Sequence, residues 1–68
     1  MNPADKGERY ARIFRKAGAF LAKGNIARAV EALKQGAELA RSEGDTRMAE
    51  RFEAEIVRAQ ATPGDPAQ

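Results

Sequence analysis

The stretch IARAVEALKQGAELARS, residues 26–42, decides the fold because it has the most regular hydrophobic period in the chain. Apolar or small side chains recur there every three or four residues, at Ile26, Ala29, Val30, Leu33, Gly36, Ala37 and Ala40. This spacing places all of them on one side of an α-helix. The segment is therefore predicted to be an amphipathic helix that buries one face.

Short breaks flank this helix on both sides. Gly24 and Gly44 are predicted to end the preceding helices in the left-handed conformation that glycine favours. Asn25 and Asp45 are predicted to cap the helices that follow. Loops of two or three residues favour neighbouring helices that run antiparallel.

These signals predict an all-α fold of three antiparallel helices in one domain, residues 1–61. The first helix begins between residues 3 and 8, capped by Asn2 or Asp5, and spans about 5–22. The third helix is predicted at about 46–60. Residues 62–68 contain two prolines, one glycine and no large apolar side chain, and are expected to form a flexible tail.

The composition limits both the core and the chemistry. Of the 29 residues counted as apolar, 15 are alanine, so few large side chains can build a core and we expect a monomer of marginal stability. Cysteine and histidine are absent, which removes thiolate nucleophiles, imidazole bases and the usual zinc ligands. Ser42 has no histidine to activate it, and Glu50, Glu53 and Glu55 lie among arginines as a solvated ion-pair lattice. We expect no enzymatic activity, no metal and no cofactor.

Residues 10–45 resemble one tetratricopeptide repeat, a pair of antiparallel helices of about 34 residues that stacks into solenoids. The residues that carry the resemblance are Tyr10, Ile13, Ala17, Phe20, Leu21, Gly24, Ala29, Val30, Leu33, Gly36, Leu39, Gly44 and Asp45. In the resemblance, Ala17 and Ala29 are the small residues where the helices cross, and Phe20 is the aromatic position. Lys16 and Arg41 depart from the pattern, since the family prefers a large apolar residue and often proline there.

The third helix does not continue the repeat, and it is interpreted as a capping helix with a polar outer face. The resemblance implies a scaffold or adaptor that binds a peptide, a helix or a protein surface along the first helix, without catalysis. Because one hairpin cannot bury both of its faces, the chain is expected to form a homo-oligomer or to be a subunit of a larger assembly.

Charge is distributed unevenly along the chain. Residues 1–28 hold seven basic and two acidic groups, whereas residues 29–68 hold five basic and eight acidic groups. This asymmetry fits contact with an acidic protein surface or with another copy of the chain, head to tail. Within the first helix, four cations fall within about a 60° arc. They form, with Phe20, the predicted partner-binding set: Arg9, Arg12, Lys16, Phe20 and Lys23.

Two further interpretations stay open. The same cations could contact phosphates, so the alternative function is a small nucleic-acid-associated or phage/host regulatory protein. Small residues also line the first helix, at Ala4, Gly7, Ala11, Gly18 and Ala22, and would suit close contact with the third helix or with a neighbouring chain. The chain has neither an apolar run long enough to span a membrane nor a secretory signal pattern at its start, so a cytoplasmic location is expected.

Overall fold

The computed structural model describes residues 3–61, with side chains described from residue 6 onward, and this part of the chain contains helices and no strand. The helices are α1 (Pro3–Ala22), α2 (Ile26–Ser42) and α3 (Thr46–Ala61). The all-α prediction is therefore confirmed, and the bounds agree closely with those expected. The cap assigned to Asn2 and the tail at residues 62–68 lie outside the described residues.

Both interhelical turns are closed by a glycine in the left-handed region. Gly44 has a φ of 71°, and its N–H donates to the Arg41 carbonyl oxygen at 3.0 Å. The Asp45 N–H reaches back to the Ala40 carbonyl oxygen at 2.8 Å. Gly24, with a φ of 77°, makes the same pattern at the end of α1. Glycine adopts this φ without the steric cost that a Cβ would impose, so both predicted helix terminators are confirmed.

The predicted N-caps are also confirmed. The Asn25 side-chain oxygen accepts a hydrogen bond from the Arg28 N–H at 3.2 Å. Asp45 Oδ1 accepts one from the Met48 N–H at 3.3 Å. Each cap satisfies a backbone donor that has no partner within the first turn of its helix.

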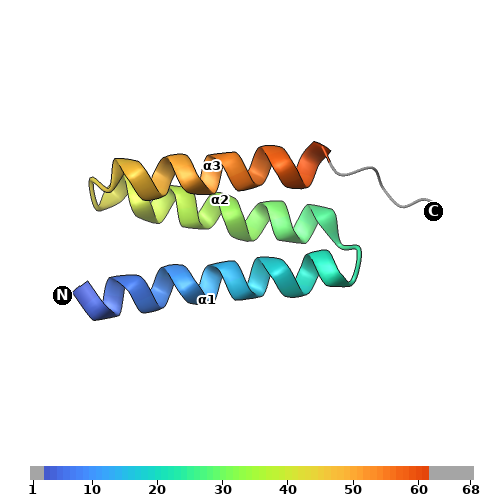
Figure 1. The fold of residues 1–68 in the computed structure, drawn as a ribbon, viewed down its shortest axis with the longest axis horizontal. Coiled ribbons are helices and arrows are strands. Elements are labelled where there is room, and N and C mark those ends of the chain that lie inside the picture. The colour runs from blue at the N-terminus through green and yellow to red at the C-terminus, as the bar shows by residue number, and fades with distance from the viewer. Residues whose placement is uncertain (1–2, 62–68) are drawn as a thin grey trace.

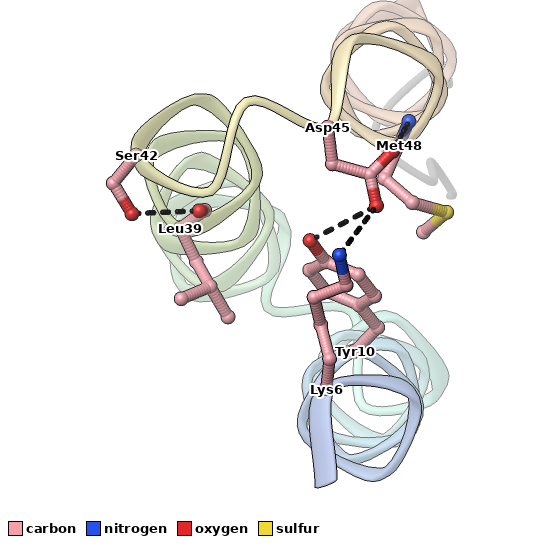
Figure 2. Close-up of polar contacts among 6 residues, drawn as sticks. All are labelled: Lys6, Tyr10, Leu39, Ser42, Asp45 and Met48. Carbon is pink, nitrogen blue, oxygen red and sulfur yellow. Dashed lines mark hydrogen bonds and ion pairs between the residues drawn. The ribbon is translucent and has the colours of Figure 1, made fainter. Parts of the chain in front are cut away.

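The chain turns back at each loop, so that α2 lies between α1 and α3 in sequence and beside both in space (Figure 1). This arrangement is compatible with the antiparallel order expected from the short loops. Viewed close to the helix axes, the three helices occupy the corners of a triangle (Figure 2). Their apolar faces meet at its centre.

The core consists of small side chains around a few large ones. Seven of its twelve buried apolar residues are alanine, which lets the helices approach closely. The core residues are Tyr10, Ala17, Ala29, Val30, Ala32, Leu33, Ala37, Ala40, Ala49, Phe52, Ile56 and Ala59. Ala17 and Ala29, the predicted crossing residues, are both buried, at 3% and 0% exposure.

Phe52 of α3 joins all three helices at the centre of the core. Its ring is 0% exposed and stacks on Phe14 of α1, with centroids 4.5 Å apart and planes at 10°. Tyr10 approaches the same ring edge-on, at 5.7 Å and 62°. On the α2 side, Gly36 makes room for the ring, because a Cβ built on Gly36 would lie 2.4 Å from Phe52 Cε1.

Two expectations about α1 need correction. Leu21 is one of the apolar residues that carry the tetratricopeptide resemblance, yet it is 37% exposed. The small-residue stripe is not covered by α3, since a Cβ built at Gly7 or Gly18 would have nothing within 4 Å. The third helix approaches α1 through Phe14 and Tyr10 instead. Among the described residues, no helix is long and apolar enough to cross a membrane.

Candidate protein-interaction site

The predicted basic residues of α1 lie on its surface. Arg12, Lys16 and Lys23 are exposed, and Arg9 is half-buried. Within the described part of the chain, no carboxylate forms an ion pair with Arg12, Lys16 or Lys23. Glu8 and Arg12 are four residues apart on α1 but form no ion pair, because both side chains are exposed and water solvates each of them well.

Lys16 and Phe20 come together at a surface pocket between α1 and α2. The pocket has a volume of about 160 Å³ and is lined by Lys16, Phe20, Arg28, Glu31, Ala32 and Gln35. Phe20 is half-buried and Ala32 is buried, so they provide apolar contact beside the charged groups. The other predicted residues, Arg9, Arg12 and Lys23, do not line it.

The residues that line this pocket carry a net positive charge. Lys16 and Arg28 contribute two cations against the single carboxylate of Glu31, and Gln35 adds an amide. No ion pair joins these charged groups within the described residues. The pocket can therefore hold an acidic group next to an apolar one. Sequence reasoning missed Arg28 and Gln35, although their separation of seven residues places them on one side of α2.

A second groove lies between α2 and α3; we call it the α2–α3 groove. It consists of two adjoining pockets of about 320 and 310 Å³ that share Arg41 and Glu53. The Arg41 guanidinium forms an ion pair with Glu53 and a second one with Glu38 at 3.6 Å. The lining residues are Lys34, Ala37, Glu38, Arg41, Gly44, Thr46, Ala49, Glu50, Glu53, Ile56 and Gln60.

A third polar cluster is centred on Asp45 (Figure 2). Besides capping α3, its carboxylate accepts a hydrogen bond from the Tyr10 hydroxyl at 3.3 Å and pairs with Lys6 Nζ at 3.8 Å. Burial, with the neighbouring Asp45 charge, raises the pKa of the Tyr10 phenol. The sequence predicted only the capping role of Asp45. No local sequence pattern indicates its contacts with Tyr10 and Lys6, which lie 35 or more positions earlier in the chain. This cluster ties the start of α3 to α1.

Of the groups considered for catalysis, Ser42, Glu53 and Glu55 make structural contacts, whereas Glu50 forms no ion pair within the described residues. The Ser42 hydroxyl donates to the Leu39 carbonyl oxygen of its own helix at 2.8 Å (Figure 2). Glu53 pairs with Arg41, and Glu55 pairs with Arg58 at 3.9 Å. The described residues contain no group of three or more histidine, cysteine or acidic side chains that could hold a metal ion.

Comparison with known protein families, curated proteins and solved structures found no match for this chain.

Proposed function

We propose that this chain is a non-catalytic protein-interaction module, an adaptor or accessory subunit, that engages a protein or peptide partner through the basic surface of α1. The predicted likeness to a tetratricopeptide hairpin supports an interaction role of this kind. The basic surface is complementary to a partner that presents an acidic side chain next to an apolar one.

The pocket between α1 and α2 is the observation that carries the proposal. It places two cations, Lys16 and Arg28, beside the half-buried ring of Phe20. Charged groups of this kind at an interface speed association and fix its register, while the apolar contact contributes affinity. A partner segment with an acidic residue one turn from an apolar residue could contact both parts of the pocket.

The test is affinity capture from the native cell extract with the wild-type chain and two matched variants. Lys16→Glu reverses a charge in the pocket, whereas Arg47→Glu makes the same change on exposed α3, where no ion pair is formed with the described residues. We expect Lys16→Glu to lose the acidic partner and Arg47→Glu to retain it. If both variants capture the same proteins as the wild type, the basic surface is not the binding site.

Nucleic-acid binding is the alternative that the same cations support. Contact with phosphates would weaken steeply as salt is added. Against it, Tyr10 is buried and Phe14 and Phe20 are half-buried, so α1 offers no fully exposed ring on which a base could stack. A salt titration with duplex and single-stranded oligonucleotides separates the two functions. If the partner is a protein, both the wild type and Lys16→Glu should bind oligonucleotides negligibly.

A further inference from the structure

The α2–α3 groove has a mixed chemistry that calls for a particular kind of occupant. Its apolar lining is the edge of the core at Ala37, Ala49 and Ile56, which are only 2%, 8% and 8% exposed. Val57, next to Ile56 on α3, is 64% exposed, the largest exposure of a large apolar side chain among the described residues. A single exposed valine is ordinary on a protein surface, but its spacing of four residues from Glu53 places it on the groove side of α3.

The charge of the groove is predominantly acidic. Its three carboxylates, Glu38, Glu50 and Glu53, face only Lys34 and Arg41. Arg41 is already engaged by Glu38 and Glu53, while Glu50 forms no ion pair within the described residues. The groove is therefore suited to a helix that combines cations with small apolar side chains.

The outward face of α1 has this composition. It presents the exposed alanines Ala19 and Ala22 among the exposed cations Arg12, Arg15 and Lys23. Arg12 and Arg15 are three residues apart, as are Glu50 and Glu53, so each pair spans one turn of its helix. Within one molecule these side chains are exposed, and no ion pair joins Arg12 or Arg15 to Glu50 or Glu53 among the described residues.

We propose that the outward face of α1 in one copy of the chain packs into the α2–α3 groove of a second copy. This inference rests on the proposed function and names a second copy as its partner. The contact joins two different surfaces, so it is head-to-tail, and each added copy leaves a groove and a basic face open for the next. A specific contact requires about 500 Å² from each copy, roughly a tenth of the 4605 Å² accessible surface.

Sedimentation velocity over a range of protein and salt concentrations tests this contact. The basic-face variant is Arg12→Gln/Arg15→Gln, and the groove variant is Glu50→Gln/Glu53→Gln. We expect the wild-type average mass to rise with protein concentration and to fall in high salt, where charges are screened. Each variant alone should self-associate about tenfold more weakly, a change that corresponds to about 1.4 kcal/mol.

Mixing the two variants provides the discriminating measurement. The basic-face variant retains an intact groove and the groove variant retains an intact basic face. The mixture should therefore favour a one-to-one heterodimer, because a further contact would join two altered surfaces. Arg47→Gln is the charge-matched control and should associate like the wild type. Val57→Ser, which alters an exposed side chain, should weaken association without a change in helicity by circular dichroism.

Three outcomes would overturn the inference. A wild-type mass that stays monomeric to hundreds of micromolar excludes self-association. A mixture of variants that stays monomeric, or a wild-type dimer that never grows, excludes a head-to-tail contact. None of these results contradicts the proposed function. That proposal is refuted only if Lys16→Glu leaves partner capture unchanged. Capture of a different protein by the α2–α3 groove, lost in Glu50→Gln/Glu53→Gln while the wild type stays monomeric, would assign the groove to that protein.

Discussion

Replacing Gly36 by alanine sets two known effects against each other. Alanine in the middle of a helix is more favourable than glycine by about 1 kcal/mol. The new Cβ would, however, lie 2.4 Å from Phe52 Cε1, whereas ordinary contact begins near 3.4 Å. The ring must therefore retreat by about 1 Å.

Phe52 has little freedom to retreat. Its ring is 0% exposed, with Phe14 stacked on it and Tyr10 against its edge. Overpacking of this kind costs about 1–3 kcal/mol, and displacing the ring also weakens aromatic contacts worth about 0.5–1.5 kcal/mol each. After the gain in helix propensity, we expect Gly36→Ala to destabilise the fold by about 1–2 kcal/mol.

Urea unfolding followed by circular dichroism measures this difference. The matched control is Gly18→Ala, another helical glycine, where a Cβ would have nothing within 4 Å. We expect the control to stabilise the chain by about 0.5–1 kcal/mol. Phe52→Leu should relieve part of the clash in a double-mutant cycle with Gly36→Ala. If Gly36→Ala stabilises the chain as much as Gly18→Ala does, the close packing of Phe52 on α2 is refuted.

Two further predictions concern the Asp45 cluster. Asp45→Ala removes the cap of α3 and the acceptor for the Tyr10 hydroxyl, so it should lower the free energy of unfolding by about 2 kcal/mol; Asp45→Asn keeps a capping oxygen and should recover most of this in the same urea assay. Equal losses for both variants would contradict the capping role. Because the folded state raises the pKa of Tyr10, its stabilising contribution is complete below the unfolded value and is lost as the pH rises above about 10. The free energy of unfolding that Tyr10→Phe removes should be smaller above pH 10 than near pH 8. Equal values at the two pH values would contradict a raised pKa for Tyr10.

The sequence by itself determined the helices and their ends. Gly24, Asn25, Gly44 and Asp45 act on groups within about four residues of themselves, so their roles as terminators and caps follow from local chemistry. The period of residues 26–42 likewise fixed which face of α2 is buried. These interactions do not depend on how the helices are placed relative to one another.

Only the tertiary structure decided which side chains on those faces are buried and which residues of different helices are in contact. Leu21 has the right period for burial but remains 37% exposed. Phe52, by contrast, reaches the centre of the core because Gly36 leaves room for its ring. Asp45 contacts Tyr10, and Lys16 shares a pocket with Arg28, only after two turns bring separate helices together. Helix periodicity specifies a direction around one axis, whereas contact and exposure also require the distances and crossing angles between axes.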